Sequence, residues 1–442
     1  MAVSTFLGLQ TALRGILAQQ RALDVTAHNV ANASTVGFTR QEALLAPSAP
    51  YAYAAASQPG QLGTGVDVTE YRRIRDAFLD VQLRAQTMRL GSAEATSDGL
   101  RQVELALNEP SDTGAASLLS RYWAAWQDVS NSPENLATRQ TLVQSAASLA
   151  EGFRTLDGQL ATLVTQAQDN VAMTLAEANS LGARVASLGA SISDALVNGS
   201  QPNDLLDERD QLLDRLYELG NVTVTSGAYG ALTVTLGGAT LVSGTVASTL
   251  SEASFPPGGL TSGKLAALRT LRDTTLPGYR ADLNTVASTL ISQTNTLHAA
   301  GFDLQGLPGG AFFTGAGADT IAVSGALLGS PGLVAASATG QPGDGARALS
   351  LAGLHTTVDP AYSLLVTRIG ADAQEAARTL GNAEVLVDAL SSRRESVSGV
   401  SLDEEMTNLL RFQRGYQASA RALSAMDEMI ELLISRTGRV GL

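Results

Sequence analysis

The residues of this sequence that could do chemistry are few and far apart. The three histidines are His28, His298 and His355, and they lack the short intervals that metal-ligating histidines usually show. The chain has no cysteine, which excludes disulfide bonds and thiolate catalysis. We expect His28 to be a polar residue near the end of a helix rather than a ligand. The sequence therefore predicts no metal site and no cofactor.

Charged residues alternate in sign between Asp207 and Arg215, where acidic side chains are interleaved with Arg209 and Arg215. This pattern is typical of a solvated helix face with local ion pairs. Trp123 and Trp126 could line a sugar site, but tryptophans at this helical spacing are more often core anchors. The chain contains no phosphate-binding loop, nucleophile elbow, zinc-protease or calcium-loop motif. We predict that the protein is not an enzyme.

Length and charge narrow the class of protein. A chain of 442 residues predicts two to four domains, and its net charge of −13 argues against a nucleic-acid partner. No apolar run approaches the ~20 residues of a membrane span. The N-terminus lacks the features of a cleaved secretory signal. Those rules alone would indicate a cytoplasmic protein, although a protein exported with an uncleaved targeting sequence would show the same features.

The elements that organise the chain are helices at its two ends. Ser401 and Glu404 form a capping-box pattern, acidic residues follow at once, and Gly438 can terminate the helix. Apolar residues recur in this helix with coiled-coil spacing, at Leu402, Leu409, Phe412, Tyr416, Leu423, Met426, Ile430 and Leu433. The first thirty residues carry a similar stripe at Phe6, Leu9, Leu13, Ile16, Leu23, Ala27 and Val30.

Two striped helices at opposite chain ends predict a paired or bundled arrangement. From periodicity alone, an ordinary pair packed on a globular core is the commoner explanation. An isolated amphipathic helix gains little in water, because nucleation is costly and its stripe stays exposed. We therefore predict that both termini are disordered in the free subunit and become ordered on assembly, with the two stripes as the subunit interface.

Between the ends, helical and β patterns alternate. A helix is predicted from about Tyr71 to Leu107, with Ile74, Phe78, Val81, Ala85 and Met88 on one side and a break at Gly91 or Gly99. A long helix restarts at Pro133 and carries leucines in sevens. Alternating β-branched residues predict strands between 222 and 257, with Gly237-Gly238 as a turn. Helix returns at 262–297, kinked or broken at Pro277, and again at 362–390.

The sequence thus predicts a mainly α protein with a small β insertion and a nested, multi-domain architecture. Its parts are paired terminal coiled-coil-like helices, a long-helix bundle domain and a small outer β domain. We expect the terminal domain to comprise 1–50 and 395–442, and the long-helix domain 51–202 and 258–394. The inserted β domain, with a leading helix, is expected at 203–257.

The stretch Leu23–Gln41 resembles the N-terminal signature of flagellar rod, hook and hook-associated proteins, in which Asn29, Asn32, Gly37 and Arg40 are the motif positions. Ser398–Glu405 and Leu409–Arg421 resemble the C-terminal signature. More specific to the hook-associated family are the stretches 73–80, 103–112, 125–134 and 203–211. Compared with larger members of this family, the β insertion is short.

The resemblance implies a structural protein of the bacterial flagellum that assembles on the distal hook end and connects hook to filament. The partners it implies are other copies of the chain, hook protein, a second hook–filament junction protein and an export chaperone. It implies an extracellular location reached without a cleaved signal peptide, and neither nucleic-acid binding nor membrane insertion. The nearest alternative is another axial protein, a hook or distal rod subunit. A secreted hydrolase is the distant alternative, since any acidic chain offers many carboxylate pairs.

Overall fold

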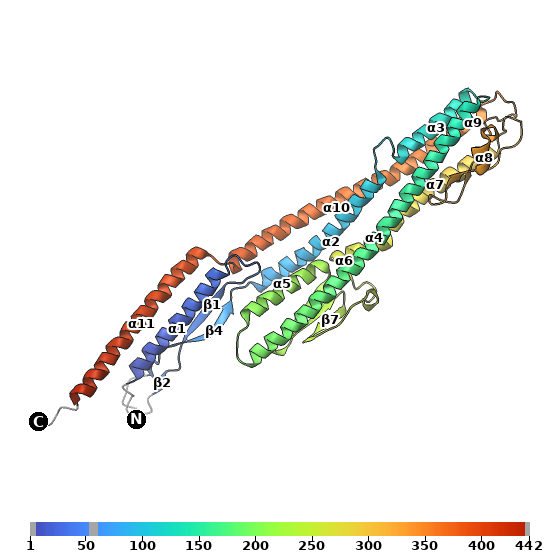
Figure 1. Cartoon of the computed structure of the whole chain (residues 1–442). Helices are drawn as coiled ribbons and strands as arrows, with labels where there is room; N and C mark the ends of the chain where they lie inside the picture. The colour runs from blue at the N-terminus through green and yellow to red at the C-terminus, as the bar shows by residue number, and fades with distance from the viewer. Residues whose placement is uncertain (1–5, 53–60, 438–442) are drawn as a thin grey trace.

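Two helices from opposite ends of the chain lie side by side at one end of an elongated molecule (Figure 1). They are α1 (Leu7–Ala31) and α11 (Leu402–Thr437) in a computed structural model that describes residues 6–52 and 61–437. About two-thirds of the structure, 68%, is helical, and a few small sheets complete it. The mainly α fold with a small β insertion is confirmed.

A two-stranded antiparallel sheet accompanies these terminal helices. It pairs β1 (Gln41–Pro47) with β4 (Val66–Arg73), and a bulge interrupts the register between Leu44 and Leu45. Two shorter strands, β2 (Tyr51–Ala52) and β3 (Gln61–Leu62), pair with each other. Both β1 and β4 pack against α1. The strand at 66–73 therefore lies with the terminal helices, whereas the sequence predicts it in the long-helix domain.

The stem of the molecule is built from long helices. In Figure 1, α2 (Ala77–Leu107) and α10 (His355–Ser398) form one side of it, while α4 (Leu136–Val197) runs along the other. The Asp76 carboxylate caps α2 by accepting the N–H groups of Phe78 and Leu79. At its other end, Asn108 adopts a left-handed conformation with φ 51°.

The break predicted at Gly91 or Gly99 is wrong, since α2 passes through both positions. A Cβ at Gly91 would lie 2.3 Å from the carbonyl oxygen of Glu218, and one at Gly99 would lie 2.5 Å from Leu271. These glycines are therefore present because neighbouring elements approach closely.

The long helix α4 begins later than predicted. It starts at Leu136, capped by the Asn135 side chain, which accepts the Ala137 N–H at 2.9 Å. The predicted restart at Pro133 is therefore wrong, and Pro133 instead offers its carbonyl to the buried guanidinium of Arg139. The leucines in sevens do mark the buried face, because Leu142 and Leu149 are fully buried.

The predicted break at Pro277 is absent, because the chain stays helical through this position. Helix α6 (Lys264–Thr270) continues through one π-helical turn, Leu271–Thr275, into α7 (Leu276–Ala299). Pro277 lies in the first turn of α7, where a missing N–H is tolerated.

The small β domain packs on α4. Its antiparallel sheet has the order β5 (Val222–Ser226), β6 (Leu232–Leu236), β7 (Ala239–Ser243) and β8 (Val246–Ala247). Gly237 and Gly238 form the predicted turn, with φ of +56° and +80°. Leu241 of β7 sits over Gly182 of α4, where an added Cβ would lie 2.7 Å away. The helix that precedes this sheet is α5 (Asn203–Leu219).

The far end of the stem holds a cluster of aromatic residues that includes both tryptophans. There α3 (Ala115–Asn131), α8 (Gly325–Gly329), α9 (Ala346–Ala352), β9 (Phe313–Thr314) and β10 (Ala322–Val323) surround the end of α4. Trp126 is fully buried against Phe312, with ring centroids 5.2 Å apart. Trp123 is 6% exposed and donates to Asp359. The core interpretation of both tryptophans therefore holds.

The histidines also have structural roles. His298 is buried, and its ring nitrogens bond to Gly310 O and to the Ala335 N–H. His355 bonds to Ala352 O. In the part of the chain that the structure describes, no group of three His, Cys, Asp or Glu side chains is placed to hold a metal ion. Over the same residues, no helix is both long and apolar enough to cross a bilayer.

Candidate functional site: the joint between the terminal helices and the stem

The chain passes twice between the terminal helices and the stem. The first passage, residues 74–76, leads from β4 into α2, and the second, residues 399–401, leads from α10 into α11. Four motif residues predicted from sequence, Asn29, Asn32, Gly37 and Arg40, all lie at this joint or in the loop beside it. The polar contacts of the joint form two main groups, which we call the clasp and the brace, and Asn32 and Gly37 lie in the loop between them.

The clasp begins with the side chain of Asn29, which is 1% exposed at the end of α1. Its Nδ2 donates to Gln41 O at 2.8 Å, and its Oδ1 accepts the Gln41 N–H at 3.0 Å. The amide thus bonds the edge of β1 as a neighbouring strand would. Nδ2 also donates to Glu405 Oε2 at 3.2 Å, which connects the first helix to the last.

Arg40 completes the clasp. Its Nε donates to Glu405 Oε1 at 2.7 Å, and its Nη1 donates to Glu404 Oε2 at 2.5 Å. Its backbone N–H donates to Ser398 O at 2.9 Å. Burial alone would lower the pKa of Arg40, but the two carboxylates raise it above its ordinary value. The capping box predicted for Glu404 is therefore incomplete: its N–H reaches Ser401 Oγ at 3.5 Å, while its carboxylate bonds Arg40.

The loop between α1 and β1 is fixed by the other two motif residues. Asn32 Nδ2 donates to His28 O at 3.1 Å and lies 3.3 Å from His28 Nδ1. Gly37 has φ +77°, and a Cβ there would lie 2.3 Å from Gln211 Nε2. That Nε2 donates to Val36 O at 3.0 Å. Glycine at position 37 thus meets both a backbone requirement and a close approach of α5.

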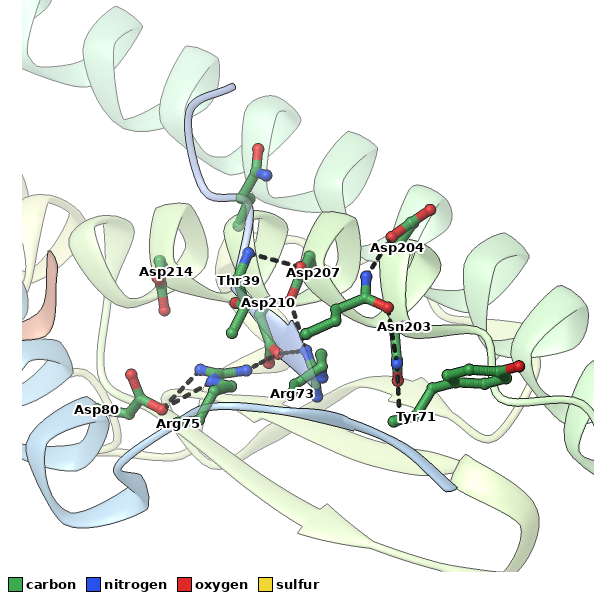
Figure 2. A network of polar contacts seen from close by, with 12 residues as sticks. Thr39, Tyr71, Arg73, Arg75, Asp80, Asn203, Asp204, Asp207, Asp210 and Asp214 are labelled. Carbon is green, nitrogen blue, oxygen red and sulfur yellow. Dashed lines mark hydrogen bonds and ion pairs between the residues drawn. The ribbon is translucent and has the colours of Figure 1, made fainter. Parts of the chain in front are cut away.

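The brace is the acidic face of α5 (Figure 2). Asp207 Oδ2 accepts the Thr39 N–H at 2.8 Å, and its Oδ1 accepts from Arg73 Nη1 at 2.8 Å. Asp210 pairs with Arg73 at 2.9 Å and also with Arg75 and Arg84. The solvated face predicted for this stretch is therefore wrong. Its carboxylates reach partners on other segments, and the side chain of Asp207 is 5% exposed.

Asp214 extends the brace to the stem. It accepts from Arg84 Nε of α2 at 2.6 Å and from Arg394 Nη1 of α10 at 2.8 Å. At the other end of α5, Asp204 Oδ1 accepts from Gln41 Nε2 at 2.7 Å and lies 3.2 Å from His28 Nε2. One helix thus contacts the motif loop, β4, α2 and α10, which are the segments that meet at the joint.

The electrostatics of the brace favour its charged form. Burial alone would raise the pKa of Asp210, but Arg75 and Arg73 outweigh it and hold the pKa below the ordinary value. Burial would likewise lower the pKa of Arg84, but Asp214 raises it. Arg209 differs, because burial lowers its pKa and its Nη1 donates to the carbonyl of Gly230. The ion pairs of Asp210 are therefore with Arg73, Arg75 and Arg84.

The two terminal helices meet through small residues. A Cβ at Gly8 would lie 2.8 Å from Met426 Sδ, one at Gly15 would lie 2.9 Å from Ser419 Oγ, and Gly415 approaches Gln19 in the same way. The buried apolar residues of α1 are Ala12, Ala18 and Ala22.

On α1 the predicted stripe lies beside this contact, whereas on α11 Met426 of the stripe takes part in it. On α1, Leu9, Ile16, Leu23 and Val30 are half-buried, while Phe6 and Leu13 are 53% and 43% exposed. On α11, Leu409, Phe412, Leu423, Met426 and Ile430 are half-buried, while Leu402 and Tyr416 are 53% and 38% exposed. The side chain of Leu433 lies outside the described residues.

Comparison with known families places both ends of the chain among flagellar axial proteins. Residues 9–39 match the model of the flagella basal body rod protein, and residues 392–436 match the C-terminal model of the flagellar basal body rod FlgEFG proteins. Residues 100–313 match the helical domain of flagellar hook-associated protein FlgK.

Whole-chain relatives decide the family. Flagellar hook-associated protein 1 of Bacillus subtilis (strain 168) is 31% identical over 98% of this chain and 99% of its own length. The chain belongs to the family of flagellar hook-associated protein 1. The Escherichia coli (strain K12) member is 25% identical over 97% of the chain and 99% of its own length. As a member of this family, the chain is a structural component of the bacterial flagellum.

A solved structure is also similar in part. The flagellar hook junction protein FlgK from Burkholderia pseudomallei shares 26% sequence identity with a TM-score of 0.48, over 53% of this chain and 46% of that one.

Proposed function

We propose that this chain assembles at the distal end of the flagellar hook and joins the hook to the filament. One observation carries the proposal: the two stretches that match rod-protein models, 9–39 and 392–436, are brought together by the clasp. Both stretches shared with rod proteins thus belong to one unit. The stem and the β domain extend away from that unit as a separate body.

The terminal unit is proposed to contact neighbouring subunits. Its helices meet through glycine and alanine, which leaves larger apolar side chains of both stripes partly exposed. Packing these side chains against neighbours would remove apolar surface from water, at about 25 cal/mol per Å². The proposed interface residues are Phe6, Leu9, Leu13, Ile16, Leu23, Val30, Leu402, Leu409, Phe412, Tyr416, Leu423, Met426, Ile430 and Leu433.

We assign the motif residues an internal role. Asn29 and Arg40 fasten the two ends to each other, while Asn32 and Gly37 shape the loop that α5 holds. A clasp of buried, mutually bonded polar groups specifies one geometry more sharply than apolar packing would. The terminal unit is thereby presented to its neighbours at a defined angle to the stem.

The remaining partners also belong to this proposal. We propose that the subunit contacts hook protein on one side and the second hook–filament junction protein on the other, and that an export chaperone accompanies it. The subunit would reach its place outside the cell through the flagellar export route without cleavage of a signal peptide. The three domains expected from sequence, with strand β4 added to the terminal one, are the proposed units of this assembly.

Truncation tests the proposed function. Cells whose protein lacks residues 413–442 should build hooks but carry no filaments, because α11 loses most of its interface. The measurement is electron microscopy of detached flagella, with Gly158→Ala as a matched full-length control. Loss of the hooks as well would indicate a hook or rod subunit instead.

A further inference from the structure

Gln41, the first residue of β1, is bonded from both sides of the joint. Its backbone N–H and carbonyl bond the side chain of Asn29 on α1, at 3.0 and 2.8 Å. Its side chain bonds the start of α5: Nε2 donates to Asp204 Oδ1 at 2.7 Å, and Oε1 accepts from Asn203 Nδ2 at 3.1 Å. Gln41 is 9% and Asn203 8% exposed. With so little water around the two amides, a group that lost its partner would not find another easily.

The neighbours of Gln41 fix which end of its amide faces which residue. The ionised Asp204 carboxylate can only accept, so it faces the amide NH2. Asn203 Nδ2 also donates to the carbonyl of Tyr71 at 2.8 Å (Figure 2), which sets the orientation of the Asn203 amide in turn. Position 41 therefore requires one donor and one acceptor at the end of the same side chain, which is what glutamine carries.

The start of α5 is attached to both strands of the small sheet. Asn203 and Gln201 bond the two backbone groups of Tyr71 on β4, while Gln41 provides the attachment on β1. A helix attached to one strand can swing about that point, whereas attachment to two neighbouring strands sets its direction. The ion pairs farther along α5 do not replace this, because long arginine side chains have the rotational freedom to follow a moving carboxylate.

Gln41 is also connected to both terminal helices. The Asn29 amide that bonds the edge of β1 donates to Glu405 of α11 as well. The edge of β1 is thus held where α1 and α11 are both in place, and the side chain of Gln41 extends from that edge to α5.

We propose that Gln41 is a positioning residue, which sets the direction of α5, and with it the stem, relative to the terminal helices. Ordering of the terminal helices during assembly fixes Gln41 through Asn29, and Gln41 then fixes the start of α5. This inference rests on the proposed function, since it names the residue through which assembly reaches the stem.

A swap of donor and acceptor tests the role of the Gln41 amide. Gln41→Glu keeps the shape of the side chain but removes its donor and places a second carboxylate beside Asp204. Asp204→Asn in the same chain supplies a donor from the other side and removes the repulsion. We call this double variant the swapped chain. Gln102→Glu is the matched control, because it makes the same change at an exposed position of α2.

The absence of cysteine allows the direction of the stem to be measured with pairs of spin labels. One pair spans the joint, with Arg21→Cys at an exposed position of α1 and Met173→Cys on α4, where Met173 is 62% exposed. The reference pair, Leu105→Cys with Met173→Cys, lies within the stem, and Leu105 is 75% exposed. Distances are measured by pulsed electron paramagnetic resonance on labelled chain bound to isolated hook ends and diluted with unlabelled chain.

The two pairs should respond differently. In Gln41→Glu the distances across the joint should spread over a broader range, while the swapped chain and Gln102→Glu should show the natural width. The distances within the stem should be the same in all four chains. An unchanged width across the joint in Gln41→Glu overturns the proposal. A broadening that the swapped chain does not reverse, or that also appears within the stem, overturns it too, because the effect is then on folding and not on the amide pairing.

Occupancy of hook ends separates this inference from the proposed function. Gln41→Glu should occupy hook ends about tenfold less than the unmodified chain, and the swapped chain should come within about twofold of it. If the unmodified chain does not bind hook ends, the proposed function fails, and the same label pairs in the dilute chain then decide the inference. If the unmodified chain binds and Gln41→Glu has the same width across the joint, only the positioning role fails.

Discussion

Arg40 Nε donates to Glu405 Oε1 over 2.7 Å, and this bond joins the loop after the first helix to the first turn of the last helix. Glu405 is 1% exposed and also accepts from Asn29. A carboxylate buried this deeply is stable only while its donors stay in place. The two chain ends are therefore linked in folding and not merely adjacent.

Removing Arg40 should release the terminal helices. Arg40→Ala leaves Glu405 without its cation, and breaking a buried ion pair on one side costs about 3 kcal/mol. Hydrogen exchange over residues 402–412 should speed up, while exchange in α4 stays unchanged. Arg72→Ala is the control, because its pair with Glu42 is about half exposed and should contribute under ~1 kcal/mol. Equal effects of the two substitutions would contradict the clasp.

If the brace holds the joint, alanine substitutions at two acidic residues of α5 should differ strongly in their effect on stability. Asp210→Ala removes the carboxylate that Arg73, Arg75 and Arg84 share and should destabilise the joint by about 3 kcal/mol. Glu208→Ala should be nearly neutral, because its pair with Arg184 is about half exposed at 3.4 Å. Urea denaturation of both variants is the measurement. A solvated α5 face would make them indistinguishable.

Acid should weaken the brace through Asp210. The folded-state pKa of this group lies below its ordinary value, so its contribution to stability is present above an unfolded pKa of about 3.9. That contribution is lost as the pH falls through the lower folded-state pKa. The free-energy difference between the natural chain and Asp210→Asn should therefore be constant near pH 6 and shrink below about pH 4. A difference that stays constant as the pH falls below 4 would argue against the charged brace.

Alanine substitutions at two glycines of the stem should change the stability of the protein in opposite directions. Gly91→Ala places a Cβ against the backbone of Glu218 and should destabilise the protein by about 2 kcal/mol through overpacking. Gly158→Ala, on an exposed part of α4 with no atom within 4 Å of the new Cβ, should stabilise it by about 0.5 kcal/mol. Thermal unfolding compares them directly. Two stabilising results would mean that α2 and α5 do not approach closely.

Limited proteolysis tests the prediction that the termini order on assembly. In dilute subunit, sites in α1 and α11 should be cut well before sites in α4, because their paired contact rests on small side chains. After assembly the same sites should resist cleavage. Termini that resist protease equally at low concentration would show that the terminal helices need no neighbours.

Local patterns predicted the helices and the small sheet well. Leu142 and Leu149 fall on the buried face of α4 as their spacing requires, and Gly237-Gly238 makes the expected turn. Both features depend on residues close in sequence. Such patterns report what one element can do, independently of its neighbours.

Close approaches between elements were not predictable from such patterns. Gly91 and Gly99 resemble helix breaks until α5 and the π turn are placed beside them. The prediction of a solvated α5 face was wrong for the same reason. The partners of Asp207 and Asp210 lie over a hundred positions away in the sequence. The sequence shows where the acidic residues are, but not which arginines they contact in the fold.

The face on which α1 meets α11 has a sequence pattern that hydrophobicity scales do not detect. Gly8, Gly15, Ala22 and Asn29 recur every seven residues, and all lie on the buried or close-packed side of the helix. Scales that reward large apolar side chains select the neighbouring stripe instead. Heptads of small residues are a better guide to helices that pack closely.

The uninterrupted course of α4 has a mechanical consequence. Its first half belongs to the core around Trp126, and its second half to the core beneath the β domain. A single rod of 62 residues, about 93 Å at ~1.5 Å each, passes through both. Twisting one end of the stem against the other must therefore strain the hydrogen bonds of that rod. If the subunit sits on a rotating hook, as we propose, its stem would then turn as one stiff lever.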